Sequence, residues 1–186
     1  MSEIVLVRHG QTEWSASGQH TSRTDLPLTE IGRERAQQLA PRLAQRSFAL
    51  VMSSPLRRAR ETAELAGFAA PVISDDLREW DYGEYEGLTT DQIRERRPDW
   101  DLWRDGCPGG ESPEQVGVRA DRVLEVMRAA AGDVLAFAHG HILRVTGARW
   151  VAQPVAFGGH LALSAGAIST LDFERTTEVL SEWNHR

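Results

Sequence analysis

Two histidines in this sequence follow directly on short apolar runs and precede a glycine. His9 comes after residues 4–7 and Arg8, and His139 comes after residues 134–138. Imidazole can act as a nucleophile or as a general acid or base near neutral pH, and a guanidinium can hold an anionic group. Either histidine alone could be an ordinary hydrogen-bonded residue. The repeated pattern predicts two imidazoles and a guanidinium at one edge of a sheet.

The periodicity of the chain predicts the elements that position these residues. Strands are expected at 4–7, 50–52, 72–73, 134–138, 167–173 and 178–183. Helices are expected from the cap Thr29 to 45, from the cap Ser54 with Pro55 first to 66, and at 90–97, 112–131 and 141–151. Residues 11–28, 76–87 and 98–110 are expected to connect them as loops. This order predicts one α/β domain over residues 1–186, a three-layer sandwich with a mostly parallel central sheet.

The composition is that of a soluble globular protein, with 41% hydrophobic and 26% charged residues. A net charge of −6 argues against a nucleic-acid or anionic-membrane partner, because those affinities depend on excess Lys and Arg. The apolar run at residues 4–7 is too short for a signal peptide or a membrane span, which predicts a cytoplasmic protein. The single cysteine, Cys107, excludes an internal disulfide and is expected to be structural.

Several motifs resemble one known family. The segment Leu-Val-Arg-His-Gly-Gln-Thr-Glu-Trp at residues 6–14 is similar to the signature of the histidine phosphatase, or phosphoglycerate-mutase-like, superfamily. The resemblance continues, in the family's order, through residues 18–32, 53–59, 77–83 and 137–141. It implies a phosphoglycerate-mutase-like fold and phosphoryl-transfer chemistry without a metal or another cofactor.

Carried over by motif, the resemblance implies five catalytic residues. His9 is the implied nucleophile, Arg8, Arg58 and His139 surround the phosphate, and Glu79 is the implied proton donor. Fixed positive charge from Arg8, Arg58 and His139 would stabilise the phosphoryl group in flight. The arginines should also help to keep His9 neutral. Beside a phosphate dianion, Glu79 is expected to be protonated near mildly acidic pH, since like charges disfavour ionisation.

The alternatives to these assignments are ordinary surface roles. Arg57 and Arg60, beside Arg58, are expected on a solvated helix face. Without the family register, Glu79 could not be chosen from the acids that surround it, which are Asp75, Asp76, Asp81, Glu84 and Glu86.

Further residues are candidates for substrate binding. They are the hydroxyl groups of Ser15, Thr21 and Ser22, the backbone amides of Gly10 and Gly140, and the side chains of Tyr82 and His141. Each hydroxyl could equally belong to a plain turn. Four aromatic residues could line a substrate mouth or pack in the core, namely Trp80, Tyr82, Trp100 and Trp103.

The chain departs from phosphoglycerate mutases of this superfamily. It has Ser15 and Ser22 where they have Asn and Gly, lacks their insertion with paired arginines, and stops three residues after Trp183. The features at residues 79–87, 103–107 and 139–141 resemble instead a phosphatase branch of broad acid phosphatases and sugar bisphosphatases. We therefore expect a phosphomonoesterase that acts on a small phosphorylated metabolite, such as a sugar phosphate.

Three other functions fit part of the sequence. A phosphoglycerate mutase would use the same chemistry, and a non-catalytic phosphoester-binding module would keep the basic pocket without turnover. The pair His139 and His141 could bind a metal, but no further ligand motif accompanies it. The oligomeric state is open, with a homodimer as one option.

Overall fold

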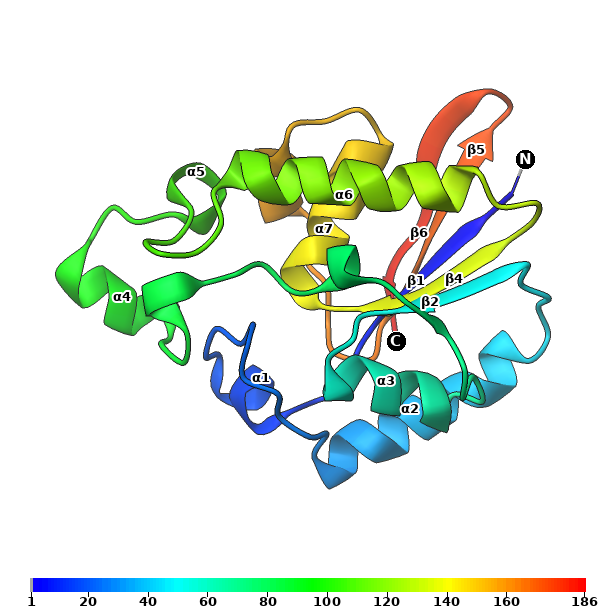
Figure 1. Cartoon of the computed structure of the whole chain (residues 1–186), viewed down its shortest axis with the longest axis horizontal. Coiled ribbons are helices and arrows are strands. Elements are labelled where there is room, and N and C mark those ends of the chain that lie inside the picture. Colours follow the sequence, from blue (N-terminus) through cyan, green and yellow to red (C-terminus); the bar gives the residue numbers. More distant parts are fainter. Residues whose placement is uncertain (1) are drawn as a thin grey trace.

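The computed structural model describes residues 2–186 and contains a six-stranded sheet in the order β3-β2-β4-β1-β5-β6. The strands are β1 (Ile4–Arg8), β2 (Leu50–Ser53), β3 (Val72–Ile73), β4 (Val134–Ala138), β5 (Ile168–Glu174) and β6 (Thr177–His185). The first four pair in parallel, and β5 and β6 add to the sheet antiparallel. The predicted mostly parallel α/β sheet is confirmed (Figure 1).

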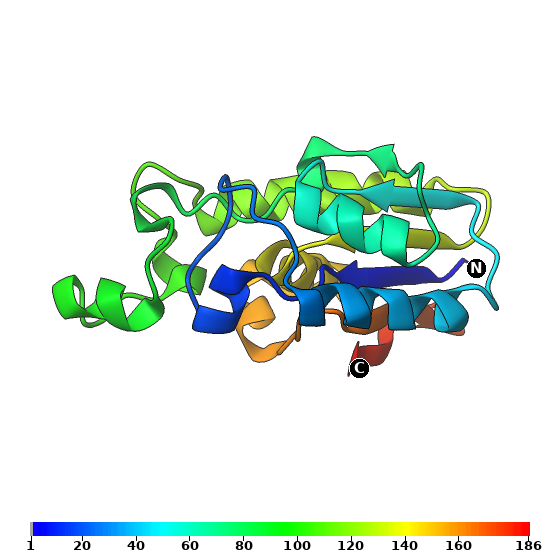
Figure 2. The same ribbon diagram turned by 90° about the horizontal axis from the view of Figure 1, so that it is seen from below.

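Helices cover both faces of this sheet (Figures 1 and 2). They are α1 (Glu13–Ser17), α2 (Glu30–Leu43), α3 (Arg57–Leu65), α4 (Thr90–Arg96), α5 (Leu102–Asp105), α6 (Pro113–Arg128) and α7 (Gly140–Trp150), with 3-10 turns η1 (Asp75–Leu77), η2 (Gly83–Tyr85) and η3 (Val155–His160). Alternate residues of a strand face opposite sides. Val5 and Val7 accordingly pack with α2 and α3, and Ile4 and Leu6 join the larger cluster under α6 and α7.

Some predicted boundaries were wrong. The segment 11–28 is not all loop, because Thr12 and Ser15 form a capping box that starts α1. Helix α3 begins at Arg57 rather than at Pro55, and Ser54 does not cap it. The Ser54 hydroxyl contacts His139 instead, so a tertiary contact overrides the local capping signal. The helix α5, which lies inside the segment predicted as a loop at 98–110, was not predicted, and neither were the turns η1, η2 and η3.

The pairing of β1 with β4 brings the two histidines together. Arg8 stands opposite Ala138 in the parallel register, and the His9 amide donates to the Ala138 carbonyl at 2.9 Å. The chain after His9 then lies against α2. A Cβ on Gly32 would stand only 2.2 Å from the carbonyl oxygen of Gln11, so this close approach requires glycine. Strand pairing and the start of α2 together fix the backbone of His9.

Candidate active site

The His9 side chain is buried and has one nitrogen available. Its Nδ1 lies 2.7 Å from the Gly10 carbonyl, which can only accept, so Nδ1 carries the proton and Nε2 keeps its lone pair. Burial lowers the pKa of His9 well below its ordinary value, and Arg58 and Arg8 lower it further, against the opposing Gly10 bond. The imidazole is therefore neutral at neutral pH. The expected effect of the arginines is present, but burial is the larger cause.

His139 lies beside His9, with ring centroids 5.1 Å apart. Its Nδ1 accepts from Arg58 Nε at 3.1 Å, so its Nε2 carries the proton and donates to the Ser54 hydroxyl at 2.8 Å. Burial, followed by Arg58 and His9, lowers the pKa of His139 well below its ordinary value. His139 is thus a neutral ring with both nitrogens engaged. The positive charge expected from it falls to the arginines.

Arg58 is fully buried and holds the loop after α1. Its Nη1 donates to the Thr24 carbonyl at 3.0 Å, and its Nη2 donates to the carbonyls of Thr21 and Ser22 at 3.1 and 3.2 Å. One N–H on Nη1 has no acceptor within residues 2–186. Arg58 therefore organises the site's loop, and its positive charge acts on the neighbouring His9.

Arg8 presents the clearest unsatisfied donor. Its Nη1 donates to the Leu163 carbonyl, whereas its buried Nε has no partner among the described residues. A buried donor without an acceptor costs roughly 1–3 kcal/mol, which an anionic ligand would relieve. A Cβ at Gly140 would stand 3.3 Å from Arg8 Cζ and Nε, so glycine lets the guanidinium lie against the start of α7.

Glu79 occupies the N-terminus of α7. Its carboxylate accepts from the amides of His141 at 3.0 Å and Ile142 at 2.9 Å, and also from Trp80 at 2.9 Å. The amides of His141 and Ile142 lie in the first turn of α7 and have no acceptor within the helix. The N-cap residue His139 supplies no side-chain bond to them. Glu79 therefore performs the capping role from a distant segment, and its exposed fraction is only 7%.

A cavity of about 250 Å³ is bordered by Arg8, His9 and Glu79. Among the predicted residues, its walls include Arg8, His9, Ser15, Thr21, Glu79, Tyr82, Gly140 and His141. Arg58 and His139 lie behind the wall, each fully buried. Gly10 and Ser22 do not line this cavity.

Most of the expected hydroxyl and amide donors are already engaged. The Ser15 hydroxyl donates to the Thr12 carbonyl at 3.0 Å as part of the α1 cap, and Thr21 donates to the Gln19 carbonyl at 3.1 Å. The Gly10 amide donates to Thr62 at 3.0 Å. Ser22 donates through its hydroxyl to the Glu86 carboxylate at 2.7 Å. These predicted contacts to substrate are therefore not prepared in this structure, because local capping and loop bonds use the same atoms.

Tyr82 and His141 form a coupled pair in the wall. Burial raises the pKa of Tyr82 well above its ordinary value, so the phenol keeps its proton and donates to His141 Nδ1 at 2.6 Å. Burial, then Arg144, His20 and Arg8, lower the pKa of His141 well below its ordinary value. His141 is therefore neutral, and its Nε2–H is left to donate to a ligand.

Of the four aromatic residues that could line a substrate mouth, only Tyr82 lines the cavity of His9. Trp80 and Trp100 are 0% and 3% exposed, and their indole N–H groups donate to the carbonyls of Glu111 and Gly106, so these two are packing residues. Trp103 is half-buried and stacks under Arg144, whose Cζ lies 4.5 Å from the ring centroid.

Among the titratable side chains of the cavity wall, two were not predicted from the sequence, His20 and Arg144. Arg144 follows His141 by three positions on α7, and residues at that spacing share a helix face. This spacing could have identified Arg144 as a neighbour of His141 in the site. His20 lies in an irregular loop, and no pattern in the sequence marks it.

His20 should make stability depend on pH. Burial lowers the pKa of His20 to about 4, against an opposing effect of Glu86. An unfolded imidazole titrates near 6.5, so between pH 6.5 and 4 the unfolded state binds the extra proton and acidification destabilises the fold. We expect His20→Gln to reduce the slope of unfolding free energy against pH by up to about 1.4 kcal/mol per unit in this window. Denaturant titrations of both proteins at several pH values measure this, and equal slopes would contradict it.

Two structural tests bear on other classes of protein. Within residues 2–186, no three or more His, Cys, Asp or Glu side chains are grouped so that they could hold a metal ion. No helix of that same part of the chain combines the length and apolarity needed to cross a membrane.

Comparisons with known proteins find similar chains. A family model described as the histidine phosphatase superfamily (branch 1) matches residues 4–186. A Mycobacterium tuberculosis protein named acid phosphatase is 42% identical over 182 residues, covering 96% of this chain and 90% of that protein. The sedoheptulose 1,7-bisphosphatase of Saccharomyces cerevisiae is 37% identical over 179 residues, covering 78% of this chain and 66% of that protein. The solved structure of an open reading frame from M. tuberculosis superimposes with a TM-score of 0.95 at 40% identity, covering 99% of this chain and 97% of that one.

Proposed function

Because this chain belongs to the histidine phosphatase superfamily, we propose that it hydrolyses small phosphomonoesters without a metal through a phosphohistidine on His9. The observation that carries the proposal is the state of His9. It is a buried neutral imidazole whose Nε2 lone pair is free while Nδ1 is fixed by a backbone carbonyl. Such a ring is prepared to attack an electrophile.

In the first half-reaction, His9 Nε2 attacks phosphorus and the bond to the leaving oxygen breaks. Arg8 lines the cavity and directs a guanidinium with an unpartnered Nε at the charge that spreads over the non-bridging oxygens. Arg58, buried behind the wall, adds a second fixed positive charge close to His9. The leaving alkoxide takes a proton from Glu79, which lines the same cavity. The products are the free alcohol and phosphohistidine.

In the second half-reaction, water replaces the alcohol. Glu79, now a carboxylate, accepts a proton from the water as its oxygen attacks phosphorus, and the bond from phosphorus to Nε2 breaks. Phosphate leaves, and His9 and Glu79 return to their starting states. The Nδ1 bond to Gly10 holds the ring in one tautomer through both steps.

A sugar phosphate or a similar metabolite is the proposed substrate class. The cavity of about 250 Å³ is small, and Tyr82, His141 and Arg144 offer polar groups for a hydroxylated leaving group. The similarity to proteins named acid phosphatase and sedoheptulose 1,7-bisphosphatase supports this class.

A panel of phosphorylated metabolites tests the function. We expect phosphate release from sugar phosphates or bisphosphates, with rates unchanged by excess EDTA because no step requires a metal. Abolition of activity by EDTA, with recovery on adding a divalent metal, would contradict the proposal. Adding 3-phosphoglycerate distinguishes a mutase, which would produce the isomer and not phosphate.

A further inference from the structure

The segment that carries Glu79 has no regular structure of its own. Residues 78–82 lie between η1 and η2 and belong to neither helix nor strand. A strand or helix would fix such a residue through its backbone ladder. A proton donor acts only within hydrogen-bond reach of the leaving oxygen, so this segment must be held in another way.

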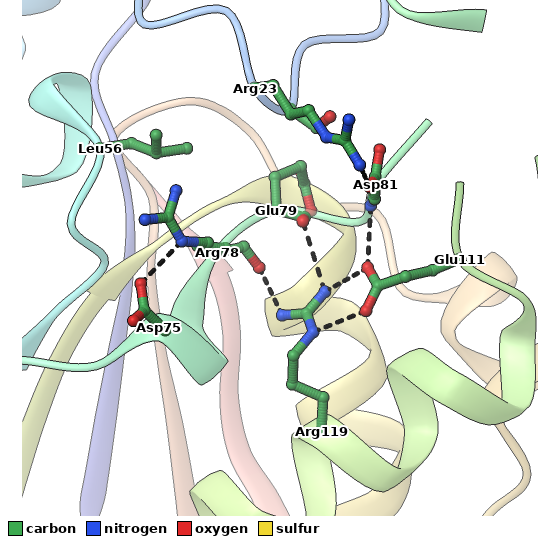
Figure 3. Close-up of a pocket in the computed structure, with 9 residues that line it drawn as sticks. Arg23, Leu56, Asp75, Arg78, Glu79, Asp81, Glu111 and Arg119 are labelled. Atoms are coloured by element: carbon green, nitrogen blue, oxygen red, sulfur yellow. Dashed lines mark hydrogen bonds and ion pairs between the residues drawn. The ribbon is translucent and has the colours of Figure 1, made fainter. Parts of the chain in front are cut away.

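Arg119, on α6, supplies that support to the backbone. Its Nη1 donates to the carbonyls of Asp76 and Arg78 at 2.8 and 2.6 Å, and its Nη2 donates to the Glu79 carbonyl at 3.3 Å. The side chain is buried, with 8% of the residue exposed. Figure 3 shows the guanidinium directed at this segment.

Glu111 completes the arrangement from the other side. Its Oε1 and Oε2 accept from Arg119 Nε at 2.8 Å and Nη2 at 2.7 Å. Oε2 also accepts from the Asp81 amide at 2.8 Å. All five N–H groups of Arg119 therefore have acceptors, and the pair holds the chain both before and after Glu79 (Figure 3).

We propose that Arg119 and Glu111 are positioning residues that set the reach of the Glu79 carboxyl into the cavity. The backbone of Glu79 is tied to α6 through Arg119, and its carboxylate is tied to the first amides of α7. Neither Arg119 nor Glu111 lines the cavity of His9; both line a second cavity, of about 440 Å³, which also borders Glu79. The inference rests on the proposed role of Glu79 as proton donor.

Arg119→Lys tests the inference through the leaving group. Lysine carries three donors on one atom and cannot reproduce the planar fork. Dinitrophenolate leaves without a proton, whereas an alkoxide needs one. We expect kcat/KM for an alkyl phosphate such as glycerol phosphate to fall by roughly 10²-fold. For 2,4-dinitrophenyl phosphate we expect a change below about threefold, because a shifted proton donor does not affect that step.

Two further variants keep the test decisive. Arg122→Lys is the matched control, because Arg122 lies on the same helix, pairs with the Asp76 carboxylate at 2.5 Å and is half-exposed. Its kcat/KM for both esters should match that of the wild type. Glu111→Gln removes the carboxylate that pairs with Arg119 and should give the same selective loss. It replaces Arg119→Lys in the test if that variant does not fold. Retained activity on the dinitrophenyl ester shows that each variant is folded.

The possible results distinguish the positioning role of Arg119 and Glu111 from the proposed phosphatase function. The kcat/KM values of Glu79→Gln are measured beside those of the other variants and should fall selectively for the alkyl ester. If it does, while Arg119→Lys and Glu111→Gln lose equal factors on both esters or nothing on either, the positioning role is wrong and the proposed function stands. If Glu79→Gln itself shows no selectivity, both the role of Glu79 and the inference fall.

Discussion

Replacement of His9 by alanine is expected to lower kcat for any phosphomonoester by at least about 10⁴-fold, because it removes the nucleophile. The fold should survive, since β1 and its pairing with β4 end at Arg8 and the His9 amide still donates to Ala138. Arg8 and Arg58 would still bind a phosphate dianion. The variant should therefore bind inorganic phosphate by calorimetry while releasing none from 4-nitrophenyl phosphate.

His160→Ala is the matched control for this experiment. His160 is exposed, lies in η3 and is absent from the cavity wall. Its removal should leave turnover unchanged. Substantial turnover by the His9 variant would mean that water attacks the substrate directly. Wild-type protein that binds phosphosugars without releasing phosphate would instead support a non-catalytic binding module.

Replacement of Glu79 by glutamine is expected to lower kcat/KM for alkyl phosphates by about 10²- to 10⁴-fold, the usual contribution of a general acid. Glutamine retains an oxygen that can accept from the His141 and Ile142 amides, so the start of α7 stays capped. It has no acidic proton to give to an alkoxide. The loss in kcat/KM, which reports only the step that forms phosphohistidine, should shrink steadily as the leaving group becomes more acidic, and kcat/KM values across a series of phenyl and alkyl esters measure this.

Glu84→Gln is a suitable control for that series, because Glu84 is an exposed carboxylate in η2, five residues after Glu79. Its rates should match those of the wild type for every ester. A loss in Glu79→Gln that is the same for good and poor leaving groups would show that Glu79 acts by orienting α7, and that another group donates the proton.

The sheet and its paired strand ends could be predicted because local patterns determine them. The apolar runs at β1 and β4 are continuous, and glycine after each histidine marks the strand end. Parallel strands in one sheet place such ends at a common edge, so the neighbourhood of His9 and His139 follows from topology alone. The match of the family motifs then singled out Arg58 and Glu79, which lie elsewhere in the chain.

The use of each polar atom could not be predicted, because it depends on tertiary contacts. Ser54 looked like a helix cap but bonds His139, and Ser15 looked like a phosphate donor but caps α1. The charge of His139 was misjudged, since burial and Arg58 together keep the ring neutral. Arg119 carries no motif, and its role depends on a segment that reaches it only in the folded chain.

The central claim is that phosphorus becomes bonded to His9 during turnover. Protein mixed with excess substrate and quenched in alkali, where phosphohistidine survives, can be digested and examined by mass spectrometry. The account predicts one added phosphoryl group on the peptide that contains His9, gone once substrate is exhausted and never formed in His9→Ala. A phosphoryl group on any other residue, or phosphate release at full rate with no labelled peptide at any time, would contradict it.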